Sequence, residues 1–203
     1  GAHARFMDFF VPGVMCFAAF LLTALLTILS FVGERKNGTL DRLLATPVRE
    51  MEVVGGYAIT FSAIGMVQSL LLISVATLAF NVRVEGNIAL AFVMVALLCV
   101  VSLSLGILLS TLARSELQAI QMMPLIVLPS FLLAGIFWPV EAIPPLIRPL
   151  SYLIPPYYAI DACRSIFVRG WGFAKVWIDV AMLALFAAVF LAAAGMVLKR
   201  RRA

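Results

Sequence analysis

Five long stretches that are almost free of charged residues dominate the sequence. They are residues 9–32, 53–82, 86–113, 117–140 and 176–198, and Asp179 is the single charged residue inside them. A membrane-spanning helix needs about 20 apolar residues, and backbone groups in lipid must bond within their own segment. The chain has 203 residues, 64% hydrophobic and 12% charged, whereas soluble domains are about half apolar and a quarter charged. We predict an all-α, polytopic transmembrane bundle of five spans, forming one domain over residues 1–203.

The distribution of lysine and arginine predicts the orientation of these spans. Five spans place nine basic residues on one side: Arg35, Lys36, Arg42, Arg49, Arg114, Lys199, Arg200, Arg201 and Arg202. Six lie on the other side: Arg5, Arg83, Arg148, Arg164, Arg169 and Lys175. Because basic residues are enriched on the cytoplasmic side, we expect the first group and the C-terminus to be cytoplasmic.

The connection between the first two predicted spans, residues 34–50, is the longest polar interruption. Its apolar residues Leu40, Leu43, Leu44, Pro47 and Val48 follow the i, i+3, i+4, i+7, i+8 spacing of a helical stripe. The spacing predicts a short amphipathic helix at about 38–50, with Thr39 as its cap. Pro47 should end this helix at Thr46, which could cap the next one. From spacing alone, such a helix would rest on lipid headgroups.

A second unusual region, residues 139–174, separates the last two predicted spans. Six of the ten prolines lie between Pro139 and Pro156, and all three tryptophans lie between Trp138 and Trp177. A long helix cannot pass through these prolines, yet the segment is too apolar for free water. We predict short broken helices dipping into the outer leaflet, held by interfacial aromatic residues. The alternative is a plain interfacial loop.

A few polar residues inside the spans could line a substrate path or bond neighbouring helices. They are Thr23, Thr27, Gln68, Gln118 and Gln121. Helix-to-helix hydrogen bonding is the commoner role for such residues. Ser102, Gly106 and Ser110 form a small-residue ridge that predicts close packing. The three scattered cysteines, Cys16, Cys99 and Cys163, are expected to be buried hydrophobes.

Motifs of enzymes and of nucleotide or metal sites are missing from the sequence. We find no phosphate-binding loop, no His-Glu-x-x-His and no paired histidine or cysteine ligands, and His3 is the single histidine. We therefore expect no catalytic site, no metal, no cofactor bound by this chain and no nucleic acid partner. A proton-coupled carrier would need deep carboxylates and an internal repeat, which are not seen. Energy must then come from another subunit.

Four segments resemble those of one family of membrane proteins. The pattern Glu34-Arg35-x-x-Gly38-Thr39-Leu40-x-x-Leu43-x-x-Thr46-Pro47 resembles the cytoplasmic motif of type 2 ABC exporter permeases. Phe10-Val11-Pro12-Gly13 opens the preceding span as it often does in that family. Phe137-Trp138-Pro139-Val140-Glu141-x-x-Pro144 and Tyr158-x-x-Asp161-Ala162-x-Arg164 are similar to its late external motifs. Together these segments cover most of the chain in the family's order.

This resemblance implies a coupling helix that docks onto a cytosolic ATP-binding subunit, which binds ATP and Mg. The coupling residues would be Glu34, Arg35, Gly38, Thr39, Leu40, Leu43, Leu44, Thr46, Pro47 and Val48. It also implies an external gate of re-entrant helices, formed by Pro139, Glu141, Pro144, Pro145, Tyr157, Tyr158, Asp161 and Arg164. Asp161 and Arg164, three residues apart, can form an ion pair.

As a permease of this family, the chain would move a substrate out of the cytoplasm across the cytoplasmic (inner) membrane, paired with a second permease copy. One further span would precede residue 1, and the start Gly-Ala-His suggests a piece of a longer protein. The substrate is not readable, because drug, lipid and polysaccharide exporters share these motifs. The alternative function is a non-transporting membrane scaffold that binds a cytosolic partner through residues 38–50.

Overall fold

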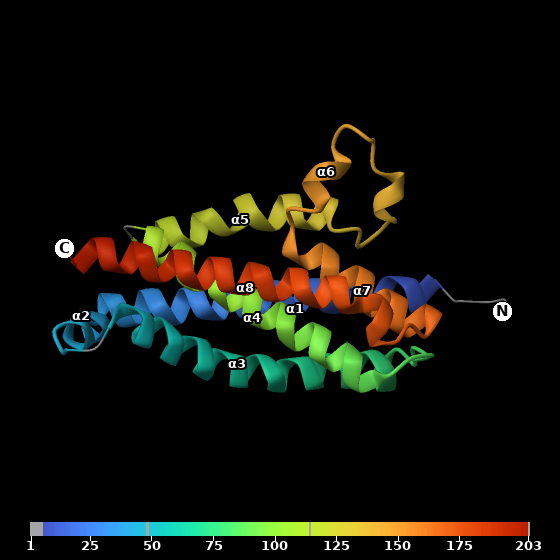
Figure 1. Ribbon diagram of the computed structural model, residues 1–203, viewed down its shortest axis with the longest axis horizontal. Helices are drawn as coiled ribbons and strands as arrows, with labels where there is room; N and C mark the ends of the chain where they lie inside the picture. Colours follow the sequence, from blue (N-terminus) through green and yellow to red (C-terminus); the bar gives the residue numbers. More distant parts are fainter. Residues whose placement is uncertain (1–5, 48, 114, 203) are drawn as a thin grey trace.

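The computed structural model describes residues 6–47, 49–113 and 115–202, which form helices joined by turns, with no strand among them. The helices are α1 (Phe6–Lys36), α2 (Thr39–Leu44), α3 (Glu50–Ser74), α4 (Ile88–Leu112), α5 (Glu116–Leu133), α6 (Arg148–Ser151), α7 (Pro155–Arg169) and α8 (Phe173–Arg202). A π-helical segment, η1 (Val75–Ala79), continues α3, and a 3₁₀ turn, η2 (Val140–Ala142), follows α5. Figure 1 shows the long helices lying along a common direction.

Four helices of the described chain are long and apolar enough to cross a membrane. They cover Met7–Lys36, Met51–Ala79, Ile88–Leu112 and Phe173–Arg200, and they match four of the five predicted spans. The remaining predicted span, 117–140, is helical only over Leu117–Leu133. The chain leaves the helix there because Gly135 takes a left-handed φ of +80°, a conformation that ends helices. Residues 134–139 therefore do not extend a full span.

Helix α4 is the centre of the bundle, and α1, α3, α7 and α8 pack against it. Small residues permit the closest approaches. A Cβ atom added to Gly106 would lie 2.8 Å from the Cβ of Thr27 on α1, and one added to Gly65 of α3 would lie 2.7 Å from the Cβ of Cys99. Real Cβ atoms do not come this close, so these glycines are needed for helix contact. The predicted packing ridge of α4 is confirmed.

The three cysteines, Cys16, Cys99 and Cys163, are free thiols, and all three are fully buried. The Cys16 thiol lies 3.7 Å from the carbonyl oxygen of Ala159 on α7. Their burial among apolar side chains confirms the prediction that they act as small hydrophobic residues.

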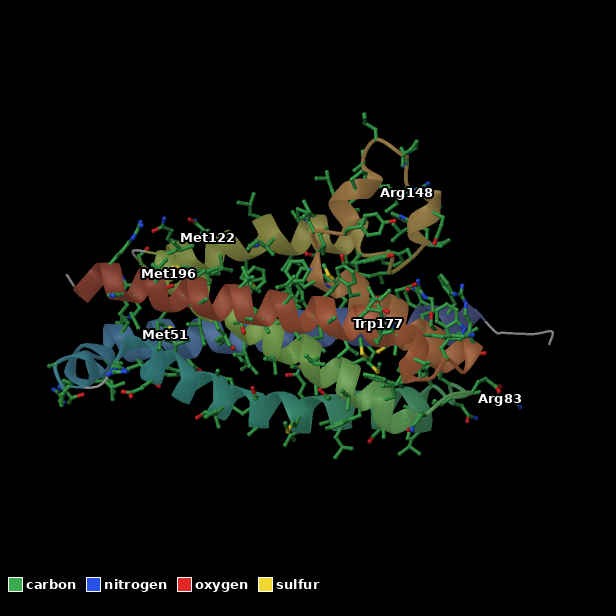
Figure 2. All side chains as sticks on the ribbon, viewed as in Figure 1. Met51, Arg83, Met122, Arg148, Trp177 and Met196 are labelled. Carbon is green, nitrogen blue, oxygen red and sulfur yellow. The ribbon has the colours of Figure 1, made fainter. Side chains whose placement is uncertain are left out.

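The two ends of the bundle differ in what they carry. Helix α2 and the end of α8 lie at one end, whereas the start of α1, the α3–α4 connection and α7 lie at the other (Figure 1). Figure 2 places Met51 and Met196 near the first end and Arg83 at the second, with Arg148 on the lobe that projects beyond α5. Side chains such as Ile59, Leu78 and Leu125 are at least 75% exposed, as expected for a lipid-facing surface.

Candidate functional site

The connection between α1 and α3 contains a helix of only six residues, Thr39–Leu44. Gly38 precedes it with φ +70°, and its carbonyl accepts a bond from the Arg42 N–H at 3.1 Å. The Thr46 hydroxyl donates to the Leu43 carbonyl at 2.6 Å, closing the turn before Pro47. The predicted helix at 38–50 is thus too long, since Thr46 and Pro47 follow α2 as non-helical residues.

Two details of the predicted capping are also wrong. Thr39 is the first residue of α2 and not its cap, because Gly38 occupies the position before the helix. Helix α3 begins at Glu50, and the Arg49 N–H donates to the Glu52 carboxylate at 2.9 Å. This local bond satisfies a backbone donor at the start of α3, and the cap position expected of Thr46 is occupied by Arg49.

The surface of this connection is open. Thr39, Leu43, Thr46 and Pro47 are exposed, and 39% of the Leu43 side chain is accessible. Val48 and the side chains of Leu40 and Leu44 lie outside the described residues. The described part of the predicted apolar stripe therefore faces away from the bundle.

Two charged residues at the end of α1 attach this connection to the bundle. The Tyr57 hydroxyl of α3 donates a hydrogen bond to the Glu34 carboxylate, and the Tyr57 ring packs edge-on against Phe31 with centroids 4.9 Å apart. Arg35 donates through Nη1 to the carbonyls of Ser110 at 3.2 Å and Ala113 at 2.7 Å. A cation at the last carbonyls of α4 also suits the negative end of that helix. Displacement of α2 would thus reach α1, α3 and α4 together.

At the opposite end, a pocket of about 150 Å³ collects most of the predicted gate residues. Five of the eight line it: Pro139, Glu141, Tyr157, Asp161 and Arg164. The other three lie outside it. Pro144 and Pro145 are exposed before α6, and Tyr158 is buried with its hydroxyl donating to the Tyr152 carbonyl at 2.8 Å.

Arg164 is the central group of this pocket. Its guanidinium donates through Nε to the Phe9 carbonyl at 3.2 Å, and through Nη2 to the carbonyls of Gly135 at 2.9 Å and Ile136 at 3.2 Å. The guanidinium carbon lies 3.6 Å from the centroid of the Phe9 ring. We call these contacts the Arg164 clamp, because they join α7 to α1 and to the turn after α5.

The predicted ion pair between Asp161 and Arg164 is not formed. Arg164 reaches carbonyls distant in sequence, which helical spacing could not indicate. The space for it comes from Gly13, where an added Cβ would lie 3.2 Å from Arg164 Nη2. The sequence did not predict Phe9, Gly135 and Ile136 as the partners of Arg164. The Phe10-Val11-Pro12-Gly13 motif had pointed only to the start of α1 as a segment of interest.

Burial sets the electrostatics of this pocket. It raises the pKa of the Asp161 carboxyl above its usual value, while Arg169 and Arg164 offset part of the increase. It lowers the pKa of Arg164 and raises the pKa of the Tyr157 and Tyr158 phenols. Both phenols are neutral near pH 7; Tyr157 can donate a hydrogen bond into the pocket, whereas the Tyr158 hydroxyl already donates to the Tyr152 carbonyl.

Of the predicted path-lining residues, three form a small hydrogen-bonded group. Thr23 donates to the Gln68 side-chain oxygen at 3.1 Å, and Gln68 donates to the Ala19 carbonyl at 3.2 Å, which links α1 to α3. Thr27 donates to the Thr23 carbonyl at 2.8 Å. Gln118 and Gln121 are exposed on α5 and do not join this group. The described residues contain no cluster of three or more potential metal ligands.

Comparison with known proteins identifies relatives that match most of this chain. The family model described as ABC-2 type transporter matches residues 2–168. ABC transporter G family member 20 of Dictyostelium discoideum is 35% identical over 178 residues, 87% of this chain and 24% of that protein. The probable multidrug ABC transporter permease YbhS of Escherichia coli is 28% identical over 194 residues, 95% of this chain and 52% of that protein.

A third relative, the inner membrane transport permease YhhJ of Escherichia coli, is 30% identical over 158 residues, 77% of this chain and 42% of that protein. The chain thus spans between about a quarter and about half of the length of these relatives. The family match covers the Glu34–Pro47 connection and the Arg164 clamp. The chain belongs to the ABC-2 type transporter family, whose members are membrane permeases of ABC transporters.

Proposed function

We propose that this chain is the membrane-spanning part of an exporter, which moves its substrate out of the cytoplasm with ATP hydrolysed by a separate subunit. The observation that carries the proposal is the exposed α1–α3 connection, held to three helices by Glu34 and Arg35. Its Leu43 side chain is open to a partner, whereas the end of α1 that leads into it is bonded to α3 and α4. Such a surface suits the groove of a cytosolic protein.

The proposed mechanism runs through α1. The ATP-binding subunit binds ATP and Mg, and its closure pushes on α2. Glu34 and Arg35 pass this push to α1, α3 and α4 at the near end. At the far end of the same α1, the Phe9 carbonyl is held by Arg164, so movement of α1 reaches the external pocket. Opening of this pocket would release substrate outside.

The proposal includes a topology and an assembly. The Leu117–Leu133 helix would be a short fifth span, which puts α2 and the C-terminus in the cytoplasm and residues 139–174 outside. The α6–α7 region would form the re-entrant gate, with Pro144 and Pro145 in its outer turn. Two permease copies would pair in the cytoplasmic membrane, each with an ATP-binding subunit. Gln118 and Gln121, exposed on α5, would face the path or the second copy.

Cysteine labelling of the full-length protein in cells tests the topology. A cysteine placed at Gly38 should be protected from an impermeant thiol reagent added outside, and one placed at Ala142 should react. Neither substitution meets a buried side chain, since Gly38 has open space around it and Ala142 is exposed, although a side chain at the positive φ of Gly38 costs about 1 kcal/mol. External labelling at Gly38 would overturn the topology and the coupling role of α2.

Transport measurements separate the exporter from the alternative, a membrane scaffold that uses the same docking surface. The full-length permease and its ATP-binding subunit are reconstituted into vesicles with the subunit on the outer surface. The exporter predicts ATP-dependent substrate uptake into such vesicles, tested with a panel of drugs, lipids and oligosaccharides. A scaffold predicts stable subunit binding with no uptake and no change in ATPase rate.

A further inference from the structure

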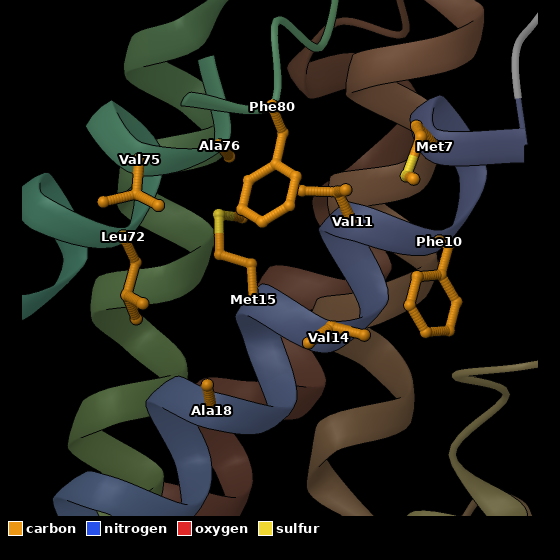
Figure 3. A pocket seen from close by; sticks show the side chains of 10 residues that line it. All are labelled: Met7, Phe10, Val11, Val14, Met15, Ala18, Leu72, Val75, Ala76 and Phe80. Atoms are coloured by element: carbon orange, nitrogen blue, oxygen red, sulfur yellow. The ribbon is translucent and has the colours of Figure 1, made fainter. Parts of the chain in front are cut away.

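An apolar groove of about 280 Å³ lies between the start of α1 and the end of α3. Every side chain that lines it is apolar, including Met7, Val11, Val14, Met15, Leu72 and Phe80. In Figure 3, Phe80 and Met15 extend from opposite helices into the space between them. Met7, Val14 and Phe80 are 40–54% exposed, so the groove opens sideways from the bundle.

The backbone along one wall of this groove is irregular. Residues Val75–Ala79 form a π-helical turn, and Phe80 bonds back to the Val75 carbonyl at 3.3 Å. Asn81 then takes a positive φ of 53°, which is uncommon for a residue with a side chain. The wide turn places Val75 and Phe80, five residues apart, on the same wall. π-Helical turns are rare in proteins overall, and those that occur are often found at functional sites.

A free cation lies in the connection just after this wall. Arg83 follows Phe80 by three residues in the turn between α3 and α4, where two spans end together. Its side chain is exposed and makes no hydrogen bond or ion pair within the described parts of the chain. Glu85, the nearest acid in the connection, is held by its backbone N–H to the Phe167 carbonyl at 3.0 Å and does not pair with Arg83.

We propose that the groove holds an acyl chain of a phospholipid whose phosphate binds Arg83. A groove with no polar lining, on spans of a membrane protein, matches a hydrocarbon chain. The arginine fork matches phosphate geometry, and the end of a span is the depth at which lipid phosphates lie. The inference is independent of the proposed export, because it needs only that these helices span the membrane.

The test uses the full-length protein in detergent with a phosphatidylglycerol probe that carries a photoreactive diazirine near the end of one acyl chain. After illumination, mass spectrometry maps the adducts. Adducts are expected within residues 7–18 and 72–80. Val14→Trp should fill the groove and lower their yield at least fivefold. Leu78→Trp is the matched control, because Leu78 is 83% exposed on the same segment and does not line the groove.

The Arg83 contact is tested with the same probe. Arg83→Gln should lower the adduct yield about fivefold, since one basic residue near a lipid surface contributes about 1 kcal/mol. A diacylglycerol probe without phosphate should respond to Val14→Trp and not to Arg83→Gln. A phosphatidylcholine probe should behave like phosphatidylglycerol, because phosphate is the recognised group.

Three results would overturn the proposal. Equal adduct yields for Val14→Trp and Leu78→Trp would mean that the groove holds no chain. An unchanged yield for Arg83→Gln would remove the phosphate contact. Disulfide cross-linking of Val14→Cys to another span of the full-length protein, or to a second copy, would show that protein fills the groove.

Discussion

Two regions that join long helices, residues 37–49 and residues 134–172, are built in opposite ways. The first has a six-residue helix, and its described side chains are almost all exposed. The second folds back on the bundle. Most of α7 is buried, and Arg164 bonds to carbonyls 28, 29 and 155 residues away.

This difference concerns which side chains are packed within the chain and which are open to another protein. Within the 134–172 region, the half-buried Arg164 guanidinium and the apolar face of α7 are satisfied by contacts within the chain, although Leu146 and Leu153 before α7 are 91% and 69% exposed. The 37–49 region satisfies its backbone locally and leaves side chains such as Leu43 open. Mutation of Arg164 in the 134–172 region should therefore act on stability, and mutation of the open side chains in the 37–49 region should act on association.

The largest effect is expected from Arg164→Ala, which removes the clamp. It should lower the free energy of unfolding by about 3 kcal/mol or more, because hydrogen bonds to charged groups contribute about 1.5–3 kcal/mol each. Thermal unfolding of the full-length protein in detergent measures this. Arg169→Ala is the control, since Arg169 lines the same pocket and lies 5.1 Å from the Trp171 ring but is exposed and makes none of the hydrogen bonds of the clamp. It should cost about 0.5–1 kcal/mol. Similar losses for the two variants would refute the clamp.

Next is Leu43→Asp, in the open connection. Burying a leucine contributes about 1.5–3 kcal/mol, so this variant should weaken binding of the ATP-binding subunit at least tenfold while thermal stability stays unchanged. Pull-down with purified subunit provides the measurement. Leu153→Asp, at a 69% exposed position of the external region, should bind the subunit as the wild type does. Equal recovery of the subunit by Leu43→Asp and the wild type would mean that α2 does not bind the subunit and instead rests on lipid.

A smaller effect is expected at the hydrogen bond from Tyr57 of α3 to Glu34 at the end of α1. Glu34→Ala and Tyr57→Phe should each lower stability by about 1 kcal/mol, spare subunit binding and reduce transport per ATP hydrolysed. Because both remove the same bond, the double variant should be no worse than the poorer single variant. Thr60→Ala is the control, since Thr60 bonds only to the Gly56 carbonyl within α3. Additive losses would show that the two residues act separately.

The smallest effect concerns pH at the external pocket. Burial raises the pKa of Asp161, so the folded protein holds this proton more tightly than the unfolded chain does. Stability should therefore fall as pH rises from the ordinary aspartate pKa of 3.8 through the raised pKa of Asp161. Asp161→Asn should flatten this part of the stability–pH profile, whereas Glu141→Gln should narrow it only slightly, since Glu141 is the smallest of the causes that act on the Asp161 pKa. A profile that Asp161→Asn does not alter would place the dependence elsewhere.

Sequence patterns located the spans well because apolar length is a local property. The predicted span 86–113 differs from α4 by two residues at its start and one at its end. Sequence patterns failed where the partner of a side chain, or the end of a helix, depended on other features of the fold. Arg164 was assigned to Asp161 because the two are one helical turn apart, but the fold offers it the Phe9, Gly135 and Ile136 carbonyls. The length of α5 was misjudged because Gly135 ends a helix that hydrophobicity alone would continue.

The grouping of gate residues was partly predictable. Pro139, Glu141, Tyr157, Asp161 and Arg164 were expected to act together and do share a pocket. Tyr158 was not distinguishable from Tyr157 by type or position. The helical rotation of α7 directs Tyr157 to the pocket and Tyr158 to the Tyr152 carbonyl.

The burial of all three cysteines has a practical consequence for spectroscopy. Fluorophores and spin labels attached through maleimide need an accessible thiolate, and Cys16, Cys99 and Cys163 have no exposed surface. A single engineered thiol at Gly38 or Ala142 should then carry nearly all of the dye, without a cysteine-free background that disturbs the packing of α1, α4 and α7. Two engineered thiols, one at each end of the bundle, would then report the distance between those ends.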